Sequence, residues 1–378
     1  MKVIYCIASV YNPGGMERVL LNKLRWFTCQ GGYDLTIVTT DQNGRPPFYD
    51  FPKEVRMIDL GINYSADNAR SPLVKIGYYF WKRWRHRHRL SDLLKREKAD
   101  IVVSLYPSES SFIPKIKDGS KKILELHYNK YFRLQYNRSG LLGLADRFRT
   151  RQDERIVRQF DRFIVLTHED AGYWGRLPNL TVIPNAALQE NSTFAAPRSS
   201  HRIIAVGRLD YQKGFDRLIN AWAVLPKVLQ EKWHLDIFGQ GEWLEMLHQQ
   251  IAHLDLGESV QIHPPTPRIS DEYAASAFLV MSSHYEGFPM VMIEAMSCGL
   301  PVVSFDYPCG PRDIIQHGVN GLIVPDGDIR ALSGAMEQLM SDEEMRAHLG
   351  AAARKVTETY SEENVMKQWK TCFRQLLS

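Results

Sequence analysis

Cysteine is scarce in this 378-residue sequence. The five cysteines are scattered and form no C-x-x-C pair, which argues against a disulfide framework and against a structural zinc site. We therefore expect a protein of a reducing, cytoplasmic compartment.

Long apolar runs are also missing. No run reaches the ~18 residues needed to span a bilayer, and the apolar stretch KVIYCIASV near the N-terminus indicates a first strand rather than a signal peptide. Low-complexity tracts and repeats of fixed period are absent as well. The length favours two domains of roughly 150 to 200 residues each.

Negative charge is under-represented in the first half. Residues 1–190 hold 31 Lys and Arg against 20 Asp and Glu, whereas the remainder holds 16 against 23. A basic half favours an anionic partner, such as a membrane, a lipid pyrophosphate or a nucleic acid. Since no RRM, KH or helix-turn-helix pattern accompanies the charge, we expect no nucleic-acid partner.

Apolar, β-rich runs recur along the chain and most are separated by stretches long enough for a helix. Their continuous apolarity is typical of parallel strands buried on both faces, so we predict an α/β protein with two successive sheets. The polar run 187–202 is the linker candidate, and helices are expected from Phe215, from Trp243 and near Ser361. The predicted strands are 2–10, 34–40, 55–60, 100–106, 121–127, 162–167 and 180–185, then 202–209, 234–241, 260–263, 278–283, 301–305 and 321–325.

The stretch EGFPMVMIEA places Glu286 and Glu294 eight positions apart. Pro289 suits the first turn of a helix, so we expect Glu286 in the preceding loop and Glu294 one to two turns into the helix. Both can then face one ligand beside an anion-binding helix start. A sugar nucleotide has hydroxyls at both ends and phosphates between. The alternative is a solvated loop glutamate and a helix glutamate paired with a lysine.

Three other stretches carry polar or glycine residues at expected strand ends. In GRLDYQKGFDRLINAW, Arg208, Lys213 and a helix N-terminus near Gly214 converge as a diphosphate site would require. In VYNPGGMERVLLNKL, Gly14 and Gly15 allow close approach of a phosphate. His127 ends KKILELH. Exposed cations, a plain tight turn and a structural histidine are the alternative readings.

Together these motifs resemble the retaining glycosyltransferases of family 4, which have the GT-B fold. The resemblance extends over GGMER, GRLDYQKGFDRLI, FGQGE, SSHYEGFPMVMIEAMSCGLPVVSFD and GPRDIIQHGVNGLIVPDGD, and it includes the E-x7-E spacing. It implies two Rossmann-like domains that face each other across a cleft. The first, 1–190, would bind the acceptor and be joined by the final helix, about 361–378; the second, 191–360, would bind the nucleotide sugar.

The resemblance also implies a role for each matching residue. Glu294 would hold the ribose hydroxyls, Arg208 and Lys213 the diphosphate, and Glu286 the hydroxyls of the transferred sugar. Gly15 would lie against the phosphates and His127 near the sugar. Glu286, Arg208, Lys213 and His127 form the expected catalytic set, and the donor-binding set is Glu294, Gly14, Gly15, Gly207, Gly287, Phe288, Pro289 and Met290.

The expected donor is a UDP-hexose or UDP-N-acetylhexosamine, with GDP-mannose as the open alternative. No DxD sequence appears where a donor metal is expected, so we expect no metal and no other cofactor. Relatives retain the anomeric configuration, which a same-face attack without a general base would explain.

The acceptor side rests on residues 72–98, which combine aromatic side chains with a dense basic run. This composition is typical of a helix lying on an anionic membrane, and it favours a lipid-linked oligosaccharide or another growing glycan as acceptor, met at the inner face of the cytoplasmic membrane. The alternative is a helix whose Phe80, Trp81 and Trp84 cover the sheet. Two other functions remain open: a sugar-nucleotide 2-epimerase and a non-catalytic partner that only binds the nucleotide sugar.

Overall fold

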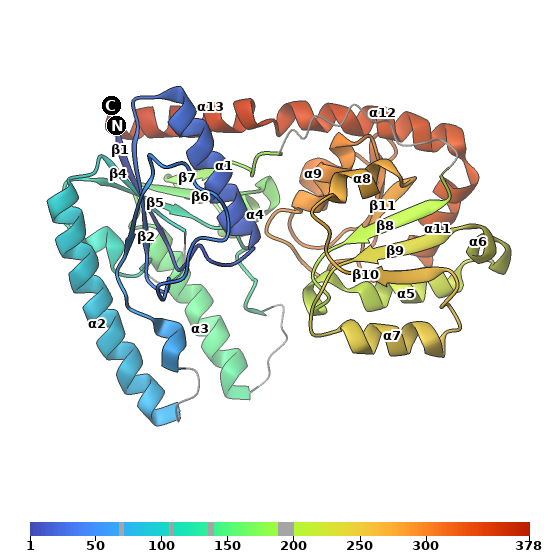
Figure 1. Ribbon diagram of the computed structural model, residues 1–378, viewed down its shortest axis with the longest axis horizontal. Coiled ribbons are helices and arrows are strands. Elements are labelled where there is room, and N and C mark those ends of the chain that lie inside the picture. The colour runs from blue at the N-terminus through green and yellow to red at the C-terminus, as the bar shows by residue number, and fades with distance from the viewer. Residues whose placement is uncertain (68–71, 106, 108, 135–139, 188–199) are drawn as a thin grey trace. The chain divides into compact units, whose positions relative to one another are not determined.

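Two compact units make up the computed structural model, which describes residues 1–67, 72–105, 107, 109–134, 140–187 and 200–378 (Figure 1). Unit 1 consists of Met1–Leu166, Ala171–Ile183 and Met366–Ser378, and unit 2 of Thr167–Asp170 and Pro184–Val365. The chain passes from unit 1 to unit 2 after residue 183 and returns to unit 1 at Met366. Most of the predicted linker, 188–199, lies outside the described residues.

Unit 1 contains a seven-stranded sheet in the order β3-β2-β1-β4-β5-β6-β7, and all neighbouring strands are parallel. The strands are β1 (Lys2–Ile7), β2 (Asp34–Thr39), β3 (Arg56–Asp59), β4 (Ile101–Ser104), β5 (Lys121–Glu125), β6 (Arg162–Val165) and β7 (Leu180–Val182). The helices are α1 (Gly15–Gln30), α2 (Pro72–Glu97), α3 (Gly140–Val157) and α4 (His168–Trp174), with short 3-10 turns η1 (Tyr64–Asp67) and η2 (Ile113–Lys115).

Unit 2 repeats this arrangement with six parallel strands in the order β10-β9-β8-β11-β12-β13. The strands are β8 (Arg202–Val206), β9 (His234–Phe238), β10 (Val260–His263), β11 (Phe278–Met281), β12 (Val302–Phe305) and β13 (Gly321–Val324). The helical elements are η4 (Tyr211–Lys213), α5 (Phe215–Val224), α6 (Lys227–Lys232), α7 (Leu244–His253), α8 (Ile269–Ala274), α9 (Met290–Ser297), α10 (Pro311–Ile314), α11 (Ile329–Ser341) and α12 (Glu343–Thr359). Helix α13 (Glu362–Leu377) begins in unit 2 and continues into unit 1.

Each predicted strand is present in one of these sheets, so the predicted α/β fold is confirmed. In both units the first six strands follow the doubly wound order 3-2-1-4-5-6, in which ligands bind beyond the carboxyl ends of the strands where the order reverses. That switch point lies between β1 and β4 in unit 1 and between β8 and β11 in unit 2.

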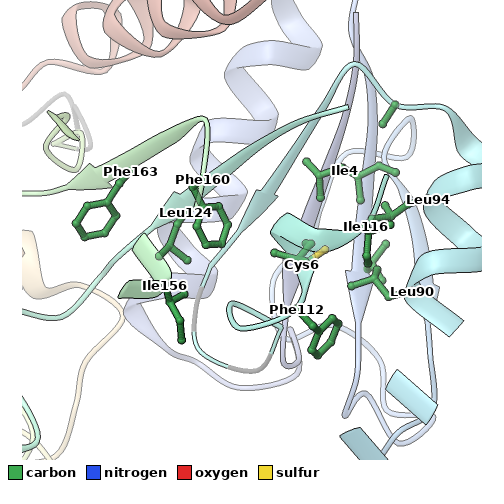
Figure 2. Packing of buried hydrophobic residues seen from close by; sticks show 14 of the residues in the cluster. Ile4, Cys6, Leu90, Leu94, Phe112, Ile116, Leu124, Ile156, Phe160 and Phe163 are labelled. Atoms are coloured by element: carbon green, nitrogen blue, oxygen red, sulfur yellow. The ribbon is translucent and has the colours of Figure 1, made fainter. Parts of the chain in front are cut away.

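The core of unit 1 explains why its strands are apolar on both faces. Figure 2 shows Ile4 and Cys6 of β1 near Leu90 and Leu94 of α2, all of them buried. Phe163 of β6 belongs to the same cluster. Full burial of each aliphatic side chain contributes about 1.5 to 3 kcal/mol, so α2 is fixed to the sheet by its C-terminal half.

Helix α13 returns the end of the chain to unit 1. The ring of Phe373 stacks on Phe27 of α1 with a centroid distance of 5.5 Å, and both side chains are fully buried. In Figure 1 the C-terminal part of α13 lies beside α1. Residues from opposite ends of the sequence therefore share one hydrophobic core.

Candidate active site

The predicted diphosphate-binding stretch of unit 2 is a tight turn after β8, at the switch point. A Cβ on Gly207 would lie 2.9 Å from the Lys213 side chain, which would then have to shift. Gly214 has a φ of 59°, and its Cβ would meet the Ser282 carbonyl oxygen at 2.4 Å. The positive φ and the backbone clash together favour glycine at position 214. The two glycines thus bring Lys213 against the end of β11.

Lys213 and Glu286, predicted to act in the same site, are in direct contact. The Lys213 Nζ donates to Glu286 Oε1 at 2.6 Å, and the Ser283 hydroxyl donates to the same oxygen at 2.9 Å. Both charged side chains are largely buried, at 13% and 8% exposed. A buried ion pair held by further hydrogen bonds has a fixed geometry. The pair therefore fixes the position of the Glu286 loop relative to the turn that follows β8.

Arg208 joins this network through Gln212. Its Nη2 donates to Gln212 Oε1 at 2.7 Å, while Gln212 Nε2 donates to Glu286 Oε2 at 3.1 Å. The Arg208 side chain is 66% exposed. Its guanidinium therefore remains accessible to an anion, in contrast to the buried Lys213 ammonium.

A third basic residue, Arg217, binds the backbone of the loop that follows β11 and leads to Glu286. It lies in the first turn of α5, where a cation opposes the helix dipole, and it donates to the carbonyl oxygens of Ser282 and Ser283 at 2.6 and 2.5 Å. Its other arm pairs with Asp326 at 2.9 Å. Arg217 thereby fixes the backbone that leads to Glu286.

The segment after Glu286 forms the start of α9. The helix begins at Met290, and Pro289 occupies the N-cap position rather than the first turn, one residue earlier than predicted. Phe288 is buried, 5.5 Å from the ring of Tyr360, and Gly287 links it to Glu286. The Met290 amide donates to the Phe288 carbonyl at 3.0 Å. This bend fixes the path of the chain between the two predicted ligand-binding glutamates.

Glu294 lies on α9, one to two turns in, as predicted. The buried Tyr273 hydroxyl donates to Glu294 Oε2 at 3.4 Å, and the Ser297 hydroxyl donates to the Glu294 carbonyl oxygen at 2.6 Å. A tyrosine hydroxyl is therefore one partner of its carboxylate.

In unit 1, Gly14 is the N-cap of α1 and Gly15 its first residue, and a carboxylate already lies against Gly14. A Cβ on Gly14 would lie 2.1 Å from Glu17 Oε2, so the Glu17 side chain folds back over Gly14. Burial raises the pKa of Glu17, although its own backbone amide and His127 partly lower it. A Cβ on Gly15 would meet no atom within 4 Å. A side chain at position 14 would therefore displace the Glu17 carboxylate, whereas a Cβ at position 15 would displace nothing.

His127 lies two residues beyond the end of β5, and its side chain is 8% exposed. The Nε2 atom is 3.3 Å from Glu125 Oε1. Burial raises the pKa of Glu125, but Lys23 and His127 outweigh this and lower it to about 2. His127 is therefore held against a carboxylate that remains ionised.

Helix α2 does not cover the sheet with the aromatic side chains considered above. Phe80, Trp81 and Trp84 are 64%, 49% and 59% exposed. Leu144 and Phe148 of α3 are exposed as well. A cavity of about 440 Å³ separates α2 from α3, and Arg83, Arg133 and Arg149 contribute to its wall. The alternative of an aromatic sheet cover is wrong.

Within the described ranges, no helix has the length and apolarity to cross a membrane.

Comparison with known proteins assigns the family. The model described as Glycosyltransferase Family 4 matches residues 13–187, and that of Glycosyl transferases group 1 matches residues 190–356. The amylovoran biosynthesis glycosyltransferase AmsD of Erwinia amylovora is 35% identical, with 97% of this chain and 98% of AmsD aligned. The chain belongs to the bacterial family 4-type glycosyltransferases.

Three further similarities extend over nearly the whole glycosyltransferase. A Campylobacter jejuni α-1,4-N-acetyl-D-galactosaminyltransferase, whose name includes an oligosaccharide-PP-undecaprenol, is 25% identical over 98% of this chain and 97% of its own. The crystal structure of TarM has a TM-score of 0.80 at 17% identity, covering 98% of each chain. That of Anabaena HepE in complex with UDP and glucose scores 0.74 at 17%, covering 99% and 100%. These structures confirm the GT-B fold.

Sequence reasoning missed two residues that organise the site of this glycosyltransferase. Gln212 is uncharged, so no charge pattern marks it, yet it bridges Arg208 and Glu286. Arg217 had a usable signal, because a cation in the first turn of a helix needs a specific partner to offset the dipole.

Proposed function

We propose that this glycosyltransferase moves a hexose or N-acetylhexosamine from a UDP-sugar to a hydroxyl of a lipid-linked glycan, with retention of anomeric configuration, in surface polysaccharide biosynthesis. The observation that carries the proposal is the joined set Arg208, Gln212, Lys213 and Glu286. Cations and a sugar-binding carboxylate are held within one hydrogen-bonded network, as a ligand with adjacent diphosphate and sugar requires.

In the proposed reaction, the bond between the anomeric carbon and the donor phosphate oxygen breaks while the acceptor hydroxyl attacks from the same face. The new glycosidic bond takes the acceptor oxygen, and the hydroxyl proton passes to the departing phosphate oxygen. Arg208 and Lys213 stabilise the negative charge that develops on that phosphate. Glu286 accepts hydrogen bonds from the sugar, and Glu294 from the ribose.

Gly15 supports placement of donor phosphates near the start of α1. A Cβ on Gly15 would meet no atom within 4 Å, so contacts of a Cβ do not account for glycine at this position. Close approach of a ligand to the backbone is a reason that remains. Glu17 occupies the same helix start, and a bound phosphate would have to displace or protonate its carboxylate.

The acceptor is inferred from unit 1. Arg83 and Arg149 lie on neighbouring helices around one cavity, with Arg133 paired to Asp153 beside them. Arg83 and Arg149 add two positive charges to the cavity wall, which favours binding of an anionic group such as a lipid-linked phosphate. The exposed Phe80 and Trp84 of α2, among basic residues, favour contact with an anionic membrane. The name of the Campylobacter relative, which includes PP-undecaprenol, supports the same class.

The donor is tested by titrating UDP, GDP and ADP, then UDP-sugars, into the protein in EDTA by calorimetry. Wild type should bind UDP, and Glu294→Ala should bind it roughly 10- to 100-fold more weakly, because a hydrogen bond to a charged group contributes about 1.5 to 3 kcal/mol. Glu337→Ala, an exposed helical glutamate of the same unit, serves as the control. If no nucleotide binds, the proposed function is withdrawn.

The membrane contact is tested by flotation with vesicles of phosphatidylglycerol or phosphatidylcholine. Wild type should float with the anionic vesicles, and Phe80→Ser/Trp84→Ser should not. Val228→Ser, which replaces a 69% exposed apolar residue in unit 2, is the matched control. Equal flotation of all three proteins would exclude this surface of α2 as the contact.

The same protein preparation distinguishes the two alternative functions. A 2-epimerase would convert a UDP-sugar to its epimer without any acceptor, and a non-catalytic partner would bind UDP but leave every UDP-sugar unchanged in the presence of membrane extract. Transfer of labelled sugar to a lipid fraction would support the proposed reaction.

A further inference from the structure

A buried ion pair lies directly behind His127 in unit 1. Lys23 of α1 donates to both carboxylate oxygens of Glu125, at 2.6 and 2.7 Å. The two side chains are 2% and 1% exposed. The Lys23 ammonium also lies 3.6 Å from the ring centroid of Trp369 on α13. Three elements from distant parts of the sequence therefore enclose one carboxylate.

Stability alone is a poor explanation for such a pair. Removing two charges from water costs several kcal/mol, and well-packed apolar side chains of similar volume often serve equally well. The Glu125 carboxylate also contacts a third residue, His127, and an apolar side chain in place of Glu125 could not make that contact. His127 Nε2 lies 3.3 Å from Glu125 Oε1, the oxygen that Lys23 also contacts.

The charge on Glu125 determines what His127 can do toward it. Burial raises the pKa of Glu125, but Lys23 and His127 outweigh this and lower it to about 2. An ionised carboxylate only accepts hydrogen bonds, so Nε2 must donate. In a neutral imidazole the other nitrogen, Nδ1, is then the acceptor.

We propose that Glu125, clamped by Lys23 beneath Trp369, is a positioning residue that keeps the His127 proton on Nε2 and leaves Nδ1 to accept a hydrogen bond from a hydroxyl of the donor sugar. This inference rests on the proposed function, together with the position near the transferred sugar that the family resemblance implies for His127.

Other titratable groups surround this chain of contacts. Glu17 faces His127 from the start of α1, and burial raises its pKa. Tyr5 of β1 adjoins Glu125, and burial raises its pKa well above the usual value. Cys372 of α13 lies near Lys23 and Arg162, and burial raises its pKa too. Of Glu17, Tyr5 and Cys372, Glu17 is the carboxyl group that interacts with His127.

The proton position is tested by long-range ¹H–¹⁵N correlation spectra of protein labelled at histidine, with His127→Asn used to assign the His127 signals. Wild type should show His127 protonated at Nε2. In Lys23→Met/Glu125→Gln, which removes both charges together, the amide can donate or accept, so the two tautomers should mix. An unchanged Nε2-protonated signal in this variant would overturn the inference.

A matched control is present on the same strand. Lys122 forms an ion pair with Asp118 whose side chains are 5% and 0% exposed, but at the opposite end of β5. Lys122→Met/Asp118→Asn should leave the His127 tautomer unchanged. If it mixes the tautomers equally, any buried pair on β5 would have the effect, and positioning by Glu125 would be wrong.

Ligand binding separates this inference from the proposed function. Calorimetry with UDP, UDP-glucose and UDP-N-acetylglucosamine should show that Lys23→Met/Glu125→Gln weakens the preferred UDP-sugar by roughly tenfold while leaving UDP unchanged, about the loss of one hydrogen bond. His127→Asn should do the same. If no variant changes UDP-sugar binding but the tautomers still mix, Glu125 positions His127 and the role of His127 toward the donor is wrong.

Discussion

Each unit contains a lysine–glutamate ion pair with the same 2.6 Å separation, and the two pairs differ in their surroundings. Lys23 and Glu125 in unit 1 are 2% and 1% exposed, whereas Lys213 and Glu286 in unit 2 are 13% and 8% exposed. An aromatic ring covers the first lysine, while a hydroxyl and an amide share the second glutamate.

This difference separates two uses of the same chemistry. Lys23 is buried beneath Trp369, so its ammonium is not available to a ligand, and its direct ionic partner is Glu125. Lys213 belongs to a network in which Gln212 and Ser283 also donate hydrogen bonds to Glu286. These two bonds can remain if the Lys213 ammonium moves to contact a phosphate. The first pair is expected to support structure and orientation, and the second to exchange partners with a ligand.

The largest expected effect is on folding. Lys23→Met leaves Glu125 as an uncompensated buried charge and should lower the free energy of unfolding by about 3 to 5 kcal/mol. Lys23→Met/Glu125→Gln should recover most of that loss. Thermal denaturation followed by tryptophan fluorescence measures both. A double variant as unstable as the single one would show that the side-chain packing, and not the charge, matters.

Glu109, a second buried carboxyl group of unit 1, provides a comparison with Glu125 because its hydrogen-bond donor is a hydroxyl rather than a cation. Ser104 donates to Glu109 at 2.5 Å, and burial raises the Glu109 pKa to about 7. A raised carboxyl pKa contributes stability below the ordinary value of 4.5, which is lost as the pH rises through 7.

Glu109→Gln should therefore raise the melting temperature at pH 8 relative to wild type, by the equivalent of roughly 1 to 3 kcal/mol, and have little effect at pH 4.5, near the ordinary carboxyl pKa. Glu125 responds in the opposite sense. Its lowered pKa contributes stability above pH 4.5 that is lost as the pH falls toward 2. Parallel pH profiles of wild type and Glu109→Gln would contradict the assignment.

Unit 2 should show a binding defect in place of a folding defect. Lys213→Met should cost at most about 1 to 2 kcal/mol of stability, since Ser283 and Gln212 still bond Glu286, but should raise the dissociation constant for UDP roughly 10- to 100-fold. Lys227→Met, at an exposed lysine of the same unit, is the control. If Lys213→Met unfolds the protein as readily as Lys23→Met, the two pairs are equivalent and the comparison fails.

The smallest expected effect is that of metal removal. Because Arg208 and Lys213 supply the positive charge that the donor diphosphate needs, we expect transfer rates in EDTA and in added Mg²⁺ to be the same. Loss of transfer in EDTA, restored by Mg²⁺, would show that two side-chain cations are insufficient.

Most of the fold could be predicted because the strands are continuous apolar runs separated by helix-length segments. The placement of Arg208, Lys213 and Glu286 near one another could be predicted because they follow β8 and β11, neighbouring strands whose carboxyl ends meet at the switch point of unit 2. The pairing of Lys23 with Glu125 could not be predicted, because 102 positions separate them and no local pattern marks two charges that meet in a core. Similarly, nothing in GGMER indicates that Glu17 folds back over Gly14.

The return of α13 to unit 1 has a consequence for biosynthesis. Phe373 and Trp369 complete the surface that covers Phe27 and Lys23, yet all of unit 2 up to Val365 is translated before them. Domains of nascent chains generally fold as units, the N-terminal one first. Here the surface of unit 1 that α13 covers is exposed while unit 2 is being synthesised. The core of unit 1 becomes complete only after α13 has been translated.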